Sequence, residues 1–376
     1  MGSWIGTSAS SPRRENETRD DPGGCGRARP ETSRRQGRAL GGSPPSFRPR
    51  RLCEMEHLIV DTDPGIDDAA ALFFALASPE VRIDLITTVF GNVSVEQATV
   101  NARRLLALAS RSAIPVRSGA SKPLRGAPKF AKHIHGSDGL GDLDWPVHDT
   151  GAAGGGASEA IVEHVNRNPG AITIMALGPL TNVALALSLD PSLAGRVNSI
   201  ICMGGAVLTM GNASPVASAN FFNDPWAAAV VYESGAPLVQ IGLDVCQKVS
   251  FTESQLSALG RDGGIPARRL AEMSRFIADA YQKTPAPVKR WSQYGATGRV
   301  YFNDVPAMGF AILPEVFSSE HLPVVIETSG VCQGQTVVDF RGQLGREPNA
   351  RVCLDVDGPR LAGLFVERVM ELGRPA

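Results

Sequence analysis

The feature that most constrains the fold is an alternation of short apolar runs with longer helical segments, which begins at residue 57 and continues towards the C-terminus. The runs are apolar along their whole length rather than at every second position, a pattern typical of strands that are covered on both faces. Such strands belong to parallel sheets, because the helices that connect them pack on each side. No internal repeat and no linker interrupts the alternation. The sequence therefore predicts a single α/β domain.

The predicted sheet is open, mostly parallel and Rossmann-like, with helices on both faces. Its strands are predicted at residues 57–62, 82–91, 172–178, 199–205, 238–245, 323–328 and 351–357. The helices are predicted at residues 69–77, 94–110, 158–167, 181–189, 225–234 and 267–283. Ser94 followed by Gln97 has the spacing of a capping box. Asp224 before Pro225 is typical of an N-cap with proline at the first helical position.

Residues 1–54 differ from the rest of the chain in composition. They are rich in Arg, Gly, Pro and Ser, with eleven arginines and six acidic residues, and they have almost no aliphatic pattern. Such a segment cannot bury enough apolar area to offset the entropy of ordering it. We therefore predict a disordered extension over 1–54 and a globular domain over 55–376, with Met55 as an alternative start.

Bulk composition excludes several classes of protein. The formal net charge of −1 gives no bias toward nucleic acid or a membrane. No apolar run approaches the roughly 20 residues of a membrane-spanning helix. The six cysteines form no C-x-x-C pair, which favours a reduced protein without a zinc site. These observations predict a cytoplasmic protein.

Four aspartates, Asp61, Asp63, Asp67 and Asp68, fall within eight residues where the first predicted strand ends. In parallel sheets, ligands bind beyond the carboxyl ends of the strands. Helix capping accounts for one or two of these acidic residues. A hard divalent cation accounts for three, because it takes carboxylate and carbonyl oxygens and offsets their repulsion. Asp304, between an apolar run and a predicted helix, is the candidate that completes the shell.

A different chemistry fits part of the same segment. Asp61 and Asp63 resemble the D-x-D of haloacid dehalogenase-type phosphatases, with Asp61 as nucleophile and Asp63 as acid/base. That mechanism also needs a phosphate-binding lysine, and no lysine follows an apolar strand run in a convincing way. It also leaves the string from Gly65 to Asp68 without a role. The phosphatase stays an alternative at this point.

The string DTDPGIDDA at residues 61–69 closely resembles the N-terminal motif of the inosine-uridine preferring nucleoside hydrolase family. Further motifs of that family follow in order over residues 57–372. They are TTVFGN (87–92), HIHGSDGLG (133–141), ALGPLTNVA (176–184), MGG (203–205), GNASPVASANFFNDPWAA (211–228) and ND (303–304). The resemblance implies hydrolysis of the N-glycosidic bond of purine or pyrimidine ribonucleosides to base and ribose, with calcium (Ca2+) as cofactor.

The resemblance also implies the roles of individual residues. Asp63, Asp67, Asp68 and Asp304 correspond to the carboxylate ligands of the metal, and Leu177 supplies a main-chain carbonyl. Asp63 corresponds to the general base that takes a proton from a metal-bound water. A metal at this position would orient the water and the ribose hydroxyls together and lower the pKa of that water.

The remaining motif positions point to the substrate. Asn92, Asn212 and Asn220 correspond to residues that hydrogen-bond the sugar hydroxyls. His135, in a Gly-rich loop, is the predicted contact for the base or the ribose, and Trp291 is a candidate aromatic contact for the base. The implied partner is a small-molecule nucleoside, with no nucleic acid required and no membrane. Family resemblance also predicts a homodimer or homotetramer.

Two positions depart from the family pattern. Ser218 stands at a sugar-binding position where the family usually has Glu, and Asn303 stands where many members have the His that protonates the leaving base. Asn hydrogen-bonds a departing base but cannot donate a proton to it in the way His⁺ does. A catalytically weak homologue that binds a nucleoside or another ribosyl ligand is therefore an alternative to an active hydrolase.

Overall fold

The computed structural model of the protein describes residues 55–145, 154–283 and 298–374, so the predicted extension over 1–54 lies outside the described residues. An eight-stranded sheet forms the centre of the domain, with strand order β3-β2-β1-β4-β5-β6-β12-β9. Every neighbouring pair is parallel except β12 and β9. The strands are β1 (Glu56–Thr62), β2 (Val81–Thr88), β3 (Val116–Ser118), β4 (Ile172–Ala176), β5 (Ser199–Met203), β6 (Leu238–Ile241), β9 (Phe317–Leu322) and β12 (Ala350–Val356). The predicted open, mostly parallel α/β sheet is confirmed.

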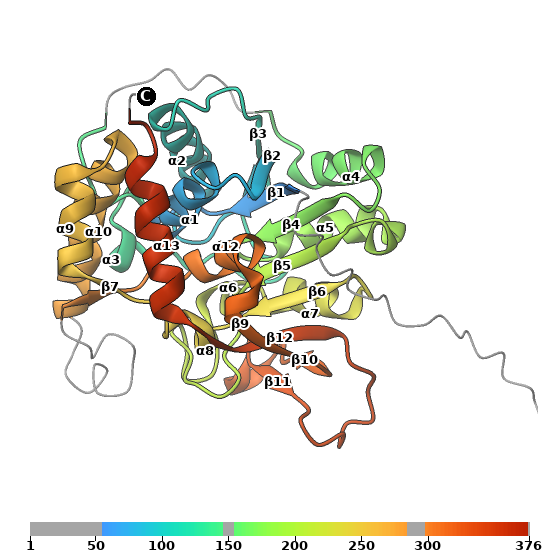
Figure 1. Cartoon of the computed structure of the whole chain (residues 1–376). Helices are drawn as coiled ribbons and strands as arrows, with labels where there is room; N and C mark the ends of the chain where they lie inside the picture. The colour runs from blue at the N-terminus through green and yellow to red at the C-terminus, as the bar shows by residue number, and fades with distance from the viewer. Residues whose placement is uncertain (1–54, 146–153, 284–297, 375–376) are drawn as a thin grey trace, which may run out of the picture. The chain divides into compact units, whose positions relative to one another are not determined.

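Helices cover both faces of this sheet, as Figure 1 shows. One face carries α1 (Ile66–Leu76), α2 (Val95–Leu108), α12 (Val305–Ile312) and α13 (Gly358–Glu371), with α9 (Glu253–Asp262) and α10 (Ile265–Lys283) packed beside them. The other face carries α4 (Ala157–Arg167), α5 (Thr181–Leu189) and α7 (Pro225–Glu233). Each face has its own apolar core, because the strands point buried side chains both ways.

Short elements complete the described chain. The short helices are α3 (Lys132–His135), α6 (Ala219–Asn223) and α8 (Leu243–Cys246), and 3-10 turns span Pro191–Gly195, Pro314–Val316 and Gly330–Cys332. Two small antiparallel pairs join β7 (Phe251–Thr252) to β8 (Arg299–Val300) and β10 (Val324–Ile326) to β11 (Thr336–Val338). Within the described ranges, no helix is both long and apolar enough to cross a membrane.

The predicted helix starts have the expected caps, with one difference. Asp224 Oδ1 accepts a hydrogen bond from the Ala227 N–H at 3.0 Å, and Pro225 is the first residue of α7. At α2, Ser94 Oγ accepts from the Gln97 N–H at 3.4 Å. The reciprocal half of the predicted capping box is not formed with the Gln97 side chain, which donates instead to Asn101 Oδ1 at 2.9 Å.

Three expectations for the strands need correction. The strand predicted at 323–328 is β10, which pairs with β11 outside the central sheet. The run predicted as strand 238–245 ends at Ile241, and its second half forms α8 after Gly242. The antiparallel edge strand β9 was not predicted, because its sequence FSSEHL is polar and half exposed. A continuous apolar run is expected only in a strand that is covered on both faces, and β9 is largely uncovered.

The order of the strands determines where a site can form. The chain runs from β1 through β2 to β3 in one direction and then returns to β4 on the other side of β1. The direction of the connections therefore reverses between β1 and β4. In open parallel sheets, a crevice forms outside the carboxyl ends of the strands at this point. The segments that follow Thr62 and Ala176 are thus placed side by side.

Candidate metal and substrate site

A cavity of about 680 Å³ lies at the carboxyl ends of these strands. Its lining includes most of the residues that the sequence singled out, and these are Asp63, Asp67, Asn92, His135, Leu177, Asn212, Asn220, Asn303 and Asp304. A second cavity of similar size, about 730 Å³, lies between α9 and α10 and contains none of the predicted site residues. We therefore take the first cavity as the candidate site.

The floor of the cavity holds a cluster of buried carboxylates. Asp67, Asp68 and Asp304 each place one oxygen so that the three atoms lie within 4.8 Å of one another. Asp67 and Asp68 are in the first turn of α1, and Asp304 directly precedes α12, which packs against α1. Asp63 lies in the turn between β1 and α1 and is also buried. Residues far apart in sequence therefore meet at one point.

Hydrogen bonds fix part of this cluster and leave part of it open. Asp68 accepts from the Gly65 N–H at 2.9 Å, from Asn92 Nδ2 at 3.0 Å and from the Thr62 hydroxyl. Asp63 Oδ2 accepts from the Asn92 N–H at 2.6 Å. Asp63 Oδ1 and Asp67 Oδ1 are buried and have no hydrogen-bond partner among the described residues. Burying a carboxylate oxygen without a hydrogen bond is unfavourable in free energy, so we expect these two atoms to bind a ligand.

The protonation of the cluster shows how unfavourable its charges are together. Burial raises the pKa of Asp67 and of Asp68 to about 6, and the charge of Asp67 contributes to the shift at Asp68. Burial raises the pKa of Asp63 and Asp304 well above the ordinary value, and the neighbouring carboxylates raise both further. A hard divalent cation removes this penalty, because it is stabilised by oxygen ligands that carry negative charge. The donor set fits such an ion.

Two glycines make room for Asp63. A Cβ at Gly91, which follows β2, would lie 1.9 Å from Asp63 Oδ2, and a Cβ at Gly178, which follows β4, would lie 2.6 Å from Asp63 Oδ1. Side chains at these positions would displace the carboxylate. The strand-end motifs GN and LGP therefore serve the site by leaving space for it.

The asparagines line the wall on the side of β4 and β5. Asn220 Nδ2 donates to the Leu177 carbonyl at 2.5 Å and to the Met203 carbonyl at 3.0 Å. Asn212 Oδ1 accepts from the Ala219 N–H at 2.8 Å. The main-chain oxygen of Leu177 is thus held at the cavity by an amide from α6.

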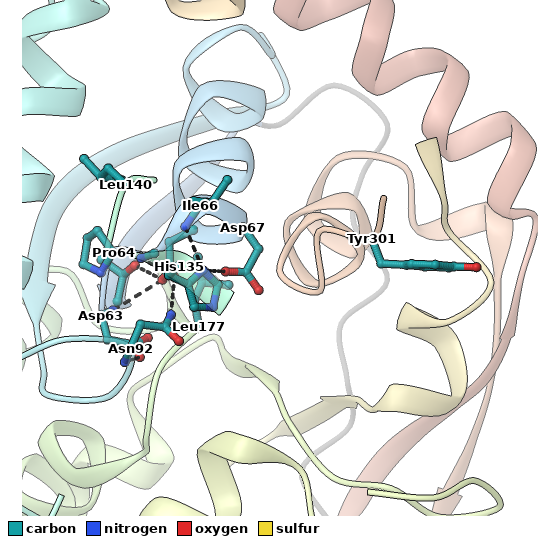
Figure 2. A network of polar contacts seen from close by, with 12 residues as sticks. Asp63, Pro64, Ile66, Asp67, Asn92, His135, Leu140, Leu177 and Tyr301 are labelled. Carbon is teal, nitrogen blue, oxygen red and sulfur yellow. Dashed lines mark hydrogen bonds and ion pairs between the residues drawn. The ribbon is translucent and has the colours of Figure 1, made fainter. Parts of the chain in front are cut away.

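His135 lies beside the aspartates, next to Asp67 (Figure 2). Its Nδ1 accepts a hydrogen bond from the Ile66 N–H at 3.2 Å and lies 3.7 Å from Asp67 Oδ1. Because Nδ1 is an acceptor, the neutral ring carries its proton on Nε2. Burial lowers the pKa of His135 to about 4, so the ring is neutral at pH 7.

Asn303 lies beside the same cluster. A hydrogen bond from its main chain lowers the pKa of Asp67. Its carbonyl accepts from Cys246 Sγ at 3.2 Å. Asn303 also lines the cavity.

Three residues named in the sequence analysis are not part of the cavity lining among the described residues. Ser218 is buried but is not part of the cavity lining, since its hydroxyl accepts from the Gly205 N–H at 2.7 Å behind the wall. Trp291 lies outside the described residues. Asp61 points away from the cavity lining, where its Oδ1 accepts from the Thr87 hydroxyl at 2.6 Å and from Asn182 Nδ2 at 2.7 Å. An aspartate held in this way is not placed to attack a phosphate.

Sequence reasoning also missed residues of the site. Tyr281 and Tyr301 line the cavity, and the Tyr281 hydroxyl donates to the Tyr301 carbonyl at 3.3 Å. The Tyr301 ring is directed away from the aspartates in Figure 2. Its place three residues before Asp304 was the available signal. Tyr281 falls within the predicted helix 267–283, where nothing marks it as different from a core residue.

Comparison with known proteins decides what kind of site this is. The family model for inosine-uridine preferring nucleoside hydrolase matches residues 58–362. The chain belongs to this family. Uridine nucleosidase 1 of Arabidopsis thaliana is 39% identical over 77% of this chain and 83% of its own length. The inosine-uridine preferring nucleoside hydrolase of Leishmania major is 35% identical over 85% of this chain and 98% of its own length.

Solved structures agree with the sequence match. A plant nucleoside hydrolase superposes with a TM-score of 0.79 at 36% identity, covering 84% of this chain and 99% of that chain. A purine-preferring ribonucleoside hydrolase from Gardnerella vaginalis gives 0.78 at 29% identity, covering 85% and 100%. The protein is a nucleoside hydrolase, an enzyme of N-glycosidic bond cleavage in ribonucleosides. The phosphatase alternative is therefore wrong, in agreement with the position of Asp61.

Proposed function

We propose that this nucleoside hydrolase depends on calcium, held by Asp63, Asp67, Asp68, Asp304 and the main-chain oxygen of Leu177. The observation that carries the proposal is a pair of buried carboxylate oxygens, Asp63 Oδ1 and Asp67 Oδ1, that accept no hydrogen bond from the described residues. They belong to a cluster of four buried aspartates. Several carboxylates and a carbonyl form the flexible, oxygen-rich set that Ca²⁺ takes, whereas Mg²⁺ usually keeps several waters.

The ion would contribute to catalysis in two ways. A calcium ion held here would lower the pKa of the attacking water and would orient that water and the ribose hydroxyls together. The chain itself must then accept a proton, hold the sugar and assist the departure of the base.

Asp63 is the proposed general base. Its Oδ2 is fixed by the Asn92 N–H, while Oδ1 has no hydrogen-bond partner among the described residues, so its lone pairs can serve both the ion and the water whose proton it takes. In the metal-free cluster the pKa of Asp63 is raised by burial and by Asp68 and Asp67, and a bound cation would oppose this shift. Gly91 and Gly178 keep the carboxylate in this orientation by leaving it space.

Asn92 and Asn220 are proposed to hold the sugar through their side-chain oxygens. Asn92 Nδ2 is engaged by Asp68, and Asn220 Nδ2 is engaged by two carbonyls. Each Oδ1 is therefore the atom left to accept a hydrogen bond from a ribose hydroxyl. Asn212 adds a third amide through its Nδ2, because its Oδ1 already accepts from the Ala219 N–H at 2.8 Å. Such bonds strengthen as the sugar approaches an oxocarbenium-like transition state.

His135 and Asn303 are proposed to act on the leaving base. The neutral His135 carries its proton on Nε2 and can donate a hydrogen bond from that atom, since Nδ1 is occupied by the Ile66 N–H. Asn303 can donate from its amide but cannot transfer a proton as an acid does. The two residues would stabilise negative charge that develops on a departing base.

Activity on defined nucleosides tests the proposal. Purified protein is incubated with uridine and inosine, the substrates that the relatives' names suggest, and with cytidine and adenosine, while released ribose is measured. We expect ribose release with calcium, its loss after chelation, and its recovery on adding Ca²⁺ back. Asp304→Asn should abolish both release and calcium binding by calorimetry, whereas the exposed control Asp355→Asn should change neither.

The alternative of a weak ribosyl-binding homologue predicts a different outcome. In that case calorimetry detects nucleoside binding to the calcium-loaded protein, while no nucleoside releases ribose. Ribose release that persists unchanged in the chelated protein contradicts the calcium proposal itself.

A further inference from the structure

Asn101 is a buried amide that does not line the cavity. It lies on α2, has no exposed surface, and is surrounded by the apolar face of an amphipathic helix. A fully buried amide in a helix is retained only where its hydrogen bonds are satisfied. The partners of Asn101 therefore indicate its purpose.

The amide of Asn101 joins two loops that carry site residues. Asn101 Nδ2 donates to the Pro64 carbonyl at 3.0 Å and to the Asp138 carbonyl at 2.7 Å. Pro64 lies in the turn that holds the metal-site aspartates, and Asp138 lies in the loop that follows His135. Asn101 Oδ1 accepts from Gln97 Nε2 at 2.9 Å, which fixes the orientation of the amide. All its polar atoms are thus used in one arrangement.

The loop after His135 is internally braced. Asp142 Oδ1 accepts from the N–H groups of Ser137 and Asp138 at 2.7 and 3.1 Å, and Asp138 Oδ1 accepts from those of Leu140 and Asp142 at 2.8 and 3.0 Å. The Gly141 N–H donates to the His135 carbonyl at 2.8 Å. These hydrogen bonds join the loop and His135 into one unit.

This braced loop packs directly on Asn101. At Gly139, φ is +83°, and a Cβ would lie 3.0 Å from Asn101 Nδ2 and 3.1 Å from the Pro64 carbonyl. Only glycine permits such an approach. A further bond between the two loops runs from the Ile66 N–H to His135 Nδ1, as Figure 2 shows.

We infer that Asn101 is a positioning residue for His135. It holds the braced loop against the aspartate turn, and thereby sets the imidazole against Ile66 and Asp67 without touching the substrate. The inference rests on the role proposed for His135 above. A displacement of about 1 Å in a group that acts on the substrate can cost up to about 100-fold in rate.

The first test measures the position of the ring directly. The chain has six histidines, so histidine-labelled nitrogen NMR of the calcium-loaded protein gives few signals. His135→Ala assigns the His135 resonances. Asn101→Leu should shift the His135 Nδ1 resonance, because the Ile66 bond loosens. Thr99→Val, a control at a buried polar position on the same helix, should leave it in place.

The second test measures whether Asn101 acts through His135. Asn101→Leu is expected to lower kcat by about 10- to 100-fold with a much smaller change in KM and unchanged calcium binding. In a His135→Ala background, the same substitution should cause no further loss, since residues in one network are not additive. Additive losses, or an unmoved His135 resonance, overturn the inference.

A milder variant covers the case in which Asn101→Leu does not fold. Gln97→Leu removes only the bond that orients the amide, so it should give a smaller change of the same kind in the NMR signal and in kcat. No effect on either readout contradicts the inference. If the unmodified protein releases no ribose at all, the proposed function fails while the NMR measurement still decides the positioning role.

Discussion

Two strands of the central sheet lead into a helix through the same pair of acidic residues, Asp-x-Asp, followed by a proline and a glycine. Pro64 and Gly65 precede α1, whereas Gly358 and Pro359 are the first residues of α13. After β12, Asp357 caps α13 by accepting from the Arg360 N–H at 3.1 Å. Asp355 pairs with Lys248 Nζ at 2.6 Å, and this bond lowers the pKa of the exposed Asp355 carboxylate. After β1, Asp61 and Asp63 are buried, and the pKa of each is raised.

The difference shows that this motif can serve either a helix or a ligand. Capping does account for Asp68, which reaches back to the Gly65 N–H at 2.9 Å. It does not account for Asp63 or Asp67, each of which keeps a buried oxygen that accepts no hydrogen bond from the described residues. The two cases differ in how buried the aspartates are and in how many of their carboxylate oxygens accept hydrogen bonds. The sequence motif alone does not distinguish them.

The largest expected effect comes from exchanging the second aspartate of each pair for asparagine. Asp63→Asn should lower kcat by about 10²–10⁴-fold, the usual contribution of a general base. Asp357→Asn should leave kcat unchanged, because Asn caps a helix about as well as Asp. Ribose release from uridine or inosine by the two purified variants measures the contrast. Equal activity of both would remove the distinction between the two strand ends.

A smaller effect is expected from calcium and pH on stability. In the metal-free protein, the pKa of Asp67 and Asp68 is about 6, above the ordinary 3.8, so the folded state binds more protons between these values. Stability contributed by these groups is therefore present at low pH and is lost as pH rises towards 6. Calcium replaces the protons, so it should stabilise strongly above pH 6 and little below pH 5.

Thermal unfolding with calcium or chelator at pH 5 and pH 7.5 measures this difference. With free calcium at about 100 times Kd, the stabilisation at pH 7.5 should be about 2.7 kcal/mol. The variant Asp355→Asn should show the same calcium dependence as the unmodified protein. A calcium shift of equal size at both pH values would mean that the raised pKa values do not belong to the binding site.

The smallest effect concerns the capping strand end. Asp357→Ala should lower the free energy of unfolding by about 1 kcal/mol, because it removes the N-cap of α13. Denaturant unfolding of the calcium-loaded protein measures this change, and kcat should be unaffected. A loss of calcium binding in this variant would show that the two ends are coupled.

The sequence predicted those features of the fold and the site that depend on residues close together in the chain. Continuous apolar runs identified the parallel sheet, and the reversal of strand order explains why residues after β1 and β4 meet. The acidic string around Asp63 identified the centre of the site before any contact was known. The helices α9 and α13 and the short strand β3 were not predicted, and β9 was missed because a polar edge strand has no apolar signature.

Long-range contacts account for what the sequence did not show. The direction of the Ser218 hydroxyl, towards the Gly205 N–H rather than the cavity, depends on how two loops pack. Asn101 looked like an ordinary polar residue of a helix until its two carbonyl partners, from separate loops, were seen. Motif spacing cannot supply such information, since the partners are tens of residues away.

The carboxylates of Asp68 and Asp304 come within 4.8 Å of each other although they belong to opposite ends of the domain's sequence. Neither half of the chain holds a complete ion-binding shell. A luminescent lanthanide added during refolding should therefore give no bound-ion luminescence until α12 has docked beside α1. Ion binding at this site would thus indicate when the first and last thirds of the chain have come together during folding.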